Sequence, residues 1–517
     1  MKTIKIKLCV SFLFLLMVSA YQAFSSQGVT FTSSAPVSPI FKGIESNPLL
    51  YVRIYIPAGE KSITLKKMAF KVDPAGSQAI ENINIYFTGR EASFNEKELL
   101  SQLNPSKINQ GLSLNLTLKP GVHYIWISAK LKDEADIDSK IEFHVSQVED
   151  VNSKKYPIME VGDGFVKRLG IVVKKGGENG IHTLRIPGIA TTNTGALISV
   201  YDIRYKNSRD LPANIDVGMN RSTDGGKSWE PMKVIIDMGE PHENNGVGDP
   251  AVLFDPISKK IWVIALWSKG NRSIAGSKPG LSEDVTGQLV VVSSDDDGIT
   301  WSKPKSITAG VKDPEWNLFF NGPGSGIAMA DGKIVFAAQY WDENAMPHST
   351  LIYSADHGTT WKTEDGPIAN TTEAQIIETQ PGILMLNMRD NRGSFRSVAT
   401  TADLGKTWVE HHTSYQALQD PVCMASFIKA NVSFKGKQKE IVFFGNDNTQ
   451  SGRYNLTIKA STDLGESWSK KNELLLDDRK LFGYSSLTKI DDHTIGIFYE
   501  GVRDMYFVRI PVNEILK

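Results

Sequence analysis

Residues 28–165 carry short runs in which apolar and polar side chains alternate, for example 49–56 and 123–128. A period of two places every second side chain on one face of a β-strand. Clusters rich in proline and glycine, such as 73–76 and 119–121, separate the runs as turns. Helical periodicity is scarce here. The pattern predicts an N-terminal antiparallel β-sandwich over residues 28–165.

From about residue 170 a second pattern repeats. Five segments fit S/T-x-D-x-G-x-S/T-W, at 222–229, 294–301, 354–361, 401–408 and 461–468. In such a turn the aspartate can accept backbone N–H bonds, the glycine can take a positive φ and the tryptophan can pack under the next strand. The uneven spacing of the segments fits four-stranded sheets with loops of unequal length. We therefore predict an all-β chain with a six-bladed β-propeller over residues 170–517 and a structural role for the turns.

The first residues have the pattern of an export signal. Residues 1–7 contain three lysines, an apolar run follows over 8–20, and small and polar residues continue to 26. This predicts a signal peptide over residues 1–26 and a protein exported to the periplasm or beyond the cell. The apolar run is shorter than the roughly 20 residues of a membrane span, so no stable membrane insertion is expected. An uncleaved anchor is the alternative.

Composition excludes several classes of site. The 57 Lys and Arg against 58 Asp and Glu give a net charge of −1, which offers no general attraction to nucleic acid. Two cysteines, Cys9 and Cys423, cannot form a disulfide framework or a cysteine-based zinc site, and Cys423 is expected to be buried as a small apolar residue. His242, His348 and the pair His411 and His412 show no metal-ligand spacing along the chain, so we predict surface histidines and no metal.

The five turns, preceded by Leu184-Arg185-Ile186-Pro187, resemble the bacterial exo-α-sialidases (neuraminidases) of the retaining type over residues of about 175–517. The resemblance implies a six-bladed propeller, which agrees with the repeat spacing. It also implies hydrolysis of terminal sialic acids from glycoproteins, glycolipids and oligosaccharides through a tyrosyl-enzyme intermediate, with no required cofactor. Sialylated glycans are then the expected partners. The N-terminal sandwich is similar to lectin-like accessory domains, and whether it binds glycan stays open.

The resemblance assigns three arginines, Arg185, Arg389 and Arg453, to the carboxylate of the sialic acid. A guanidinium donates to a carboxylate in a planar, bidentate way and keeps its charge at any working pH. Arg392 and Arg396 are the competitors for the second position, and we interpret them as loop residues.

The resemblance also assigns the nucleophile and its base. Tyr484 takes the place of the nucleophile, and Glu373, sixteen residues before Arg389, takes that of the base. A neutral phenol avoids the repulsion that a carboxylate nucleophile would meet at an anomeric carbon that already bears a carboxylate. Glu378 is the rival base.

Asp210, twenty-five residues after Arg185, matches the acid/base of the family by its offset. Asp202 and Asp216 are alternatives.

Two further residues, Arg204 and Asp249, match family positions that contact substrate hydroxyl or amide groups. The glycine-rich stretch 321–326 lacks the Lys-Ser/Thr ending of a phosphate loop, and we predict a close turn bordering the pocket.

Two other functions remain open. Because the repeats specify a fold rather than a chemistry, a non-catalytic propeller that binds glycans is one alternative. A trans-sialidase or intramolecular trans-sialidase is another. The presence of all six core candidates (Arg185, Asp210, Glu373, Arg389, Arg453 and Tyr484) favours an enzyme.

Overall fold

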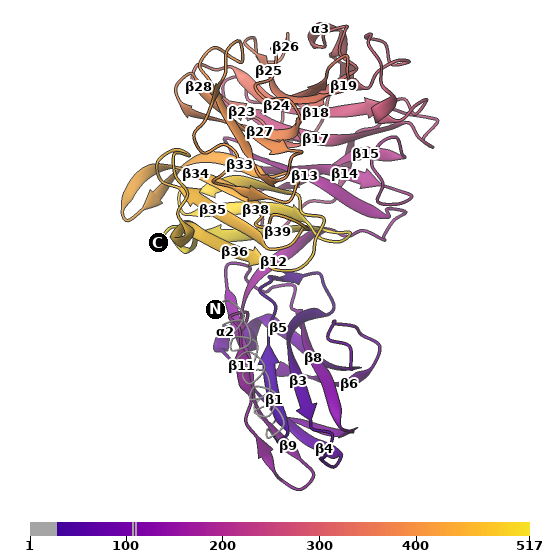
Figure 1. The fold of residues 1–517 in the computed structure, drawn as a ribbon, viewed down its shortest axis with the longest axis vertical. Helices are drawn as coiled ribbons and strands as arrows, with labels where there is room; N and C mark the ends of the chain where they lie inside the picture. The colour runs from indigo at the N-terminus through magenta and orange to yellow at the C-terminus, as the bar shows by residue number, and fades with distance from the viewer. Residues whose placement is uncertain (1–27, 106–107, 109–110) are drawn as a thin grey trace, which may run out of the picture. The chain divides into compact units, whose positions relative to one another are not determined.

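The computed structural model describes residues 28–105, 108 and 111–517 (Figure 1). The predicted signal peptide, residues 1–26, lies outside the described residues. The chain divides into two compact units between Leu169 and Gly170. A search of the described residues for a helix with the length and apolarity of a membrane span finds none.

The N-terminal unit is built from two sheets around one apolar cluster. The first has the order β11-β1-β3-β8-β5-β6, and in the second β9 and β4 pair with each other and β7 pairs with β4. Buried side chains of both sheets, among them Leu50, Ile54, Ile127 and Phe143, share that cluster. The strands are β1 (Thr30–Ser34), β2 (Ile40–Lys42), β3 (Asn47–Ile56), β4 (Ile63–Val72), β5 (Ile80–Gly89), β6 (Leu99–Leu103), β7 (Leu112–Leu118), β8 (Gly121–Leu131), β9 (Lys140–Asp150), β10 (Lys155–Tyr156) and β11 (Met159–Val161).

Strand β3 shows why the alternating pattern forms a sandwich. Its buried positions recur with a period close to two, so one face meets the core and the other is partly open. The predicted turn at 73–76 is instead the start of a short helix, α2 (Pro74–Ala79). Asp73 caps it by accepting from the Gly76 amide, and proline is well tolerated in the first helical turn.

Within the described part of the C-terminal unit, six sheets follow one another along the chain (Figure 1). Their strands are β13 (Thr183–Thr191), β14 (Leu197–Arg204), β15 (Ile215–Ser222) and β16 (Lys233–Ile236); β17 (Gly246–Asp255), β18 (Lys260–Ser268), β19 (Gln288–Ser294) and β20 (Lys305–Ser306), with β22 (Gly324–Ser325); β21 (Leu318–Asn321), β24 (Ile334–Trp341), β25 (Pro347–Ser354) and β26 (Lys362–Thr363), with β23 (Ile327–Ala328); β27 (Thr371–Gln380), β28 (Ile383–Asp390), β30 (Ser397–Thr401) and β31 (Val409–Glu410); β33 (Ser426–Phe434), β34 (Lys437–Asp447), β35 (Leu456–Ser461) and β36 (Glu473–Asp477); and β37 (Ser485–Asp491), β38 (Thr494–Glu500) and β39 (Met505–Pro511) with β12 (Val166–Lys174). This arrangement confirms the predicted six-bladed propeller.

The sixth sheet is completed by the first strand of the unit. In β12, Ile171 pairs with Phe507 and Val172 with Tyr506 of β39, and the strands run antiparallel. The ring is therefore closed by hydrogen bonds between strands more than 300 residues apart in sequence.

Smaller elements lie in the connections between strands and after the last strand. They are the strand pair β29 (Ser394–Phe395) and β32 (Gln419–Asp420), the 3-10 helices η2 (Ile274–Gly276) and η3 (Lys470–Asn472), and the helical turns α3 (Thr308–Val311) and α4 (Val512–Ile515).

Each of the five repeated turns joins the third and fourth strands of its sheet, and all five share one hydrogen-bond pattern. In the second turn, Asp296 accepts from the Thr300 amide and from the hydroxyls of Thr300 and Ser294, at 2.8, 2.6 and 2.8 Å. These bonds lower the pKa of Asp296 to about 2.

The glycine of each turn has a positive φ, and some of these glycines also pack closely against a neighbouring side chain. A Cβ at Gly358, where φ is +86°, would lie 2.2 Å from the Trp262 ring. The predicted need for glycine is therefore conformational and steric.

Candidate active site

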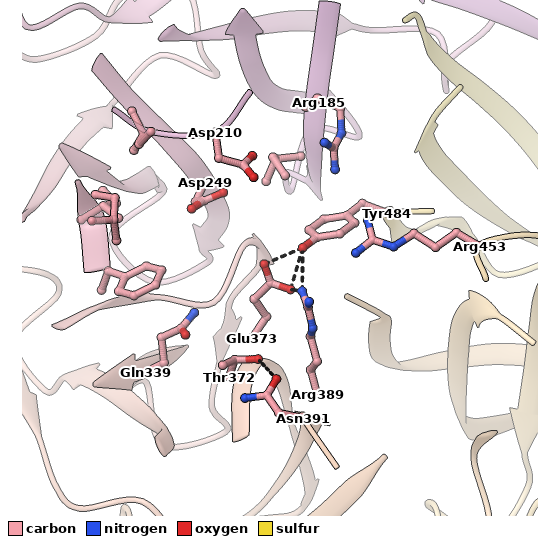
Figure 2. Close-up of a pocket in the computed structure, with 15 residues that line it drawn as sticks. Arg185, Asp210, Asp249, Gln339, Thr372, Glu373, Arg389, Asn391, Arg453 and Tyr484 are labelled. Atoms are coloured by element: carbon pink, nitrogen blue, oxygen red, sulfur yellow. Dashed lines mark hydrogen bonds and ion pairs between the residues drawn. The ribbon is translucent and has the colours of Figure 1, made fainter. Parts of the chain in front are cut away.

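One cavity of about 320 Å³ collects seven of the eight predicted site residues (Figure 2). They are Arg185, Asp210, Asp249, Glu373, Arg389, Arg453 and Tyr484. The eighth, Arg204, does not line the cavity.

Antiparallel pairing explains why these residues meet. Arg185 lies near the start of β13 and Glu373 near the start of β27, while Arg389 lies near the end of the adjacent strand β28. Tyr484 directly precedes β37, and Arg453 lies in the loop between β34 and β35. In a hairpin the start of one strand lies beside the end of the next, so these positions share one end of the ring.

The three predicted arginines surround one aromatic ring. The guanidinium carbons of Arg185 and Arg453 lie 5.4 and 5.5 Å from the centre of the Tyr484 ring. Arg389 donates from Nη1 to the Tyr484 hydroxyl over 3.1 Å. Three cations from separate sheets therefore face a single small volume.

Arg185 is held by a residue that the sequence analysis missed. Glu500, fully buried, accepts from Nε and Nη2 of Arg185 at 2.6 and 3.1 Å. It also accepts from the backbone amides of Ile186 and Tyr484, both at 3.0 Å. A charged partner in a buried position raises the pKa of Arg185 despite its burial. The only sign of this role in the sequence was that Glu500 is an acidic residue directly after the apolar run 495–499.

The Tyr484 hydroxyl donates to Glu373, whose two oxygens lie 2.5 and 2.7 Å away. Glu373 is also ion-paired with Arg389. Burial raises the pKa of Tyr484 well above its usual value, and the negative charge of Glu373 raises it further, while Arg389 lowers it. The free protein thus holds a neutral phenol that already has a proton acceptor and a cation at its oxygen.

A group of acids lies on the other side of the opening, where Figure 2 shows Asp210 and Asp249 facing Tyr484 and Glu373. Asp210 has 77% of its side chain exposed, and one of its oxygens lies 2.6 Å from Nη2 of Arg204. The same Nη2 of Arg204 also donates to the Asp202 carboxylate, over 2.8 Å. Arg204 is therefore a buried link between two carboxylates in this structure, and its contact with substrate stays a prediction.

Asp249 is held in a strained backbone conformation, with φ +55°. Its amide donates to Asp202 over 2.9 Å. Burial raises the pKa of Asp249, and the nearby charges of Asp202, Glu373 and Asp210 add to the increase. Burial likewise raises the pKa of Asp202 to about 6, although Arg204 opposes it.

The alternative acids have other partners and do not line the cavity. Asp216 accepts from the Tyr205 hydroxyl at 2.8 Å. Glu378 accepts from the amides of Ala330 and Gly382 at 2.7 and 2.8 Å, so its role is in joining two turns.

The competing arginines differ from each other. Arg392 pairs with Asp390 and is half exposed. Arg396 lies between β29 and β30 as a loop residue, yet it is fully buried and donates to the carbonyl of Cys423 at 2.7 Å. Cys423 is a buried free thiol.

The glycine-rich stretch 321–326 supports the site from outside the cavity lining. Asn321 donates from its amide side chain to the carbonyl of Asp249 over 2.7 Å. Gln375 donates to the carbonyl of Pro323 over 2.8 Å. The close turn thus fixes the backbone that carries Asp249.

The rest of the cavity wall was not predicted. Its remaining residues are Ile186, Leu211, Leu266, Ile274, Phe320, Gln339, Thr372 and Asn391. They have no common sequence motif, because strands and loops of several sheets supply them at separate positions.

Comparisons with known proteins agree with this geometry. A family model described as a BNR repeat-like domain matches residues 209–497, and one described as the N-terminal domain of BNR-repeat neuraminidase matches residues 28–155. A sialidase of Bacteroides fragilis is 40% identical over 93% of this chain and 94% of that protein. A sialidase of Clostridium perfringens is 30% identical over 61% of this chain and 85% of that protein. The solved structure of the Hadza microbial sialidase Hz136 has a TM-score of 0.86 and 38% identity, covering 94% of this chain and all of that one. Taken with the six-bladed ring and its cluster of arginines, these matches show that the chain belongs to the bacterial sialidase family of glycoside hydrolases, with BNR repeats and an N-terminal BNR-associated domain.

Proposed function

We propose that this sialidase releases terminal sialic acids from glycoproteins, glycolipids and oligosaccharides with net retention, through a covalent intermediate on Tyr484. The observation that carries the proposal is the Tyr484 hydroxyl, bonded to Glu373 and Arg389 and flanked by Arg185 and Arg453.

Substrate orientation follows from the three arginines. A sialoside bears a carboxylate on its anomeric carbon, and charge-assisted hydrogen bonds to such a group are worth about 1.5–3 kcal/mol each. Binding the carboxylate between Arg185, Arg389 and Arg453 brings the anomeric carbon over the Tyr484 hydroxyl.

Bond cleavage then uses two proton transfers. Glu373 takes the proton of the Tyr484 hydroxyl as its oxygen attacks the anomeric carbon, and Arg389 stabilises the charge that develops on that oxygen. Asp210 gives a proton to the departing glycosidic oxygen as the bond breaks.

Release reverses these roles. Asp210, now a carboxylate, takes a proton from water, whose oxygen attacks the anomeric carbon. The bond to Tyr484 breaks, and Glu373 returns its proton to the departing tyrosine oxygen. Two displacements at one carbon return the original anomeric configuration.

Covalent trapping tests the nucleophile. A sialidase of Trypanosoma rangeli has been solved with 2,3-difluorosialic acid as a covalent intermediate. We expect the Tyr484 oxygen to displace the anomeric fluoride of the same compound, so that one 3-fluorosialyl group is added to this protein and peptide mass spectrometry locates it on Tyr484. Tyr484→Phe should take up no label while keeping its thermal stability. A label on another residue, or equal labelling of the variant, would refute the assignment.

Product analysis tests hydrolysis against transfer. Linkage-defined sialyllactoses should give free sialic acid, whose first-formed anomer, followed by NMR, is the α form. An anhydro sugar, or a sialylated acceptor as the main product, would instead establish the trans-sialidase alternatives.

We also propose that the protein is exported. The support is the basic and apolar pattern of residues 1–26. N-terminal sequencing of the protein recovered from the periplasm and the medium should find a start close to residue 27. Recovery from the cytoplasm with Met1 retained would contradict export.

A further inference from the structure

We propose that His411, His412 and Glu466 form a surface site for a divalent transition metal, with Zn²⁺ as the best match. In the described residues, these side chains offer ligand atoms that all lie within 4.8 Å of one another. None of the three lines the active-site cavity. No metal-ligand spacing is visible along the chain, because Glu466 lies 54 residues beyond His412.

Two segments bring the ligands together. The histidines directly follow β31 of the fourth sheet, and Glu466 lies in the repeated turn of the fifth sheet between β35 and β36. The turn geometry around Asp463 fixes Glu466, because Asp463 accepts from the Ser467 amide and hydroxyl at 3.0 and 2.5 Å.

The ring of His412 is oriented by a backbone acceptor. Its Nε2 lies 3.0 Å from the carbonyl oxygen of Glu466. A carbonyl can only accept, so Nε2 carries a proton and Nδ1 is the free nitrogen of the neutral ring. That Nδ1 lies 3.6 Å from Oε2 of Glu466.

The ring of His411 has a similar support. The Thr413 hydroxyl, which can donate or accept, lies 2.8 Å from its Nδ1, and the Thr413 amide donates to the same nitrogen over a longer 3.4 Å. When Nδ1–H donates to the hydroxyl, Nε2 is free, and it lies 3.4 Å from Oε1 of Glu466. An outer hydrogen bond at the second ring nitrogen is typical of metal-binding histidines.

Two nitrogen lone pairs that face one carboxylate need a cation between them. Protonation of both imidazole rings can supply this positive charge, and so can a bound metal ion. In a tetrahedral zinc site with bonds of about 2.0–2.1 Å, neighbouring ligand atoms are about 3.3 Å apart. The two nitrogen–oxygen distances of 3.4 and 3.6 Å are close to that value. Two imidazoles and a carboxylate suit Zn²⁺ rather than Mg²⁺ or Ca²⁺, which prefer oxygen ligands.

The consequence of binding is a link between two blades. The ion would tie the segment after β31 to the turn between β35 and β36. Because a ligand that binds only the folded state stabilises it, the readout is thermal stability rather than turnover.

The test uses tag-free, chelator-treated full-length protein titrated with ZnCl₂ in a calorimeter. We expect one ion per chain and a melting temperature about 1–3 °C higher in excess zinc. MgCl₂ should give neither signal. His412→Ala and Glu466→Gln should each weaken binding at least about tenfold. His242→Ala is the matched control, since His242 is another partly exposed histidine beside two carboxylates, and it should bind as the unmodified protein does.

Three results would overturn the proposal. They are the absence of a one-to-one zinc isotherm, an isotherm unchanged in His412→Ala and Glu466→Gln, or equal loss in His242→Ala. The first result would mean that protons alone bridge these groups.

Discussion

The five repeated turns and the region of the active-site cavity both contain acidic side chains of the propeller, but their surroundings act on the charge in opposite ways. In the turns each aspartate receives several hydrogen bonds, which hold the pKa of Asp296 and Asp356 at about 2. At the cavity, burial and neighbouring acidic charges raise the pKa of Asp249, which lines it, and of Asp202, which accepts from the Asp249 amide. A carboxylate that accepts its full set of hydrogen bonds stabilises the fold. A buried carboxylate close to other acidic groups has a perturbed pKa and is available for proton transfer.

The two regions also differ in how they are built. Every turn is encoded by eight consecutive residues, so it repeats in five sheets. The cavity takes Arg185, Glu373, Arg453 and Tyr484 once each from different sheets. Local sequence specifies the turns, and only the closed ring specifies the cavity. Substitutions should therefore separate stability from turnover.

The largest effect is expected for Glu373→Gln. Without a base at the Tyr484 hydroxyl, kcat should fall by about 1,000-fold, while the melting temperature changes little. Steady-state kinetics with a fluorogenic sialoside and a thermal melt measure both. Glu378→Gln on the same strand is the matched control, since Glu378 bonds two backbone amides outside the cavity, and it should lower stability and keep turnover. Equal kinetic losses in both variants would remove Glu373 from its role.

Asp210→Asn should give the next largest effect, and its size should depend on the leaving group. For sialyllactose, which needs a proton on the departing oxygen, kcat/KM should fall by about 100-fold or more. For an aryl sialoside with an acidic phenol the loss should be below about tenfold. Asp216→Asn serves as the control, because Asp216 bonds Tyr205 outside the cavity. Equal losses on both substrates would argue against Asp210 as the acid.

In the turns, Asp296→Ala should lower stability and keep turnover. It removes three hydrogen bonds of an exposed side chain, at a cost of about 1–3 kcal/mol in unfolding free energy. Its neighbour Asp295 makes only a surface ion pair with Lys260, at 3.1 Å, so Asp295→Ala should cost less than about 1 kcal/mol. Denaturant unfolding measures the unfolding free energy of both variants. Similar losses in Asp296→Ala and Asp295→Ala would contradict the structural role of Asp296.

A pH-dependent effect on stability is expected for a buried acid beside the site. Asp447 is fully buried, and apart from the Cys423 thiol neither of its oxygens has a hydrogen-bond partner. Burial raises its pKa from 3.8 to about 8, although Arg453 opposes this. Between pH 4 and 8 the unfolded chain loses this proton and the folded chain keeps it, so Asp447 makes the protein less stable as the pH rises.

Asp447→Asn removes that titration. The variant should gain stability relative to the unmodified protein between pH 5 and pH 8, by an amount on the order of 1–3 kcal/mol. Thermal melts of both proteins across this range give the difference in their stability at each pH. The titration of all other groups cancels in that difference. A difference independent of pH would show that Asp447 is ionised in the folded protein.

The sequence predicted most of the architecture and those site residues that carry a local signal. Alternation, the five turns and their spacing were sufficient for the sandwich and the six-bladed ring, because these depend on short-range patterns. Arg185 and Tyr484 could be proposed through resemblance. Glu500 could not, since its importance lies in a contact with Arg185 that spans 315 residues. Short helix α2 was missed because Asp73 and Pro74 suit a helix start as well as a turn.

The propeller closes when β12 pairs with β39, and the active site is completed in the same step. Arg185 gains Glu500 only when the two ends of the propeller meet, and contacts of such sequence separation form slowly. Until then β12 and β39 expose unpaired edges that can join another molecule. During refolding, sialidase activity should return later than the circular-dichroism signal of the sheets, and dilute conditions should favour its recovery over aggregation.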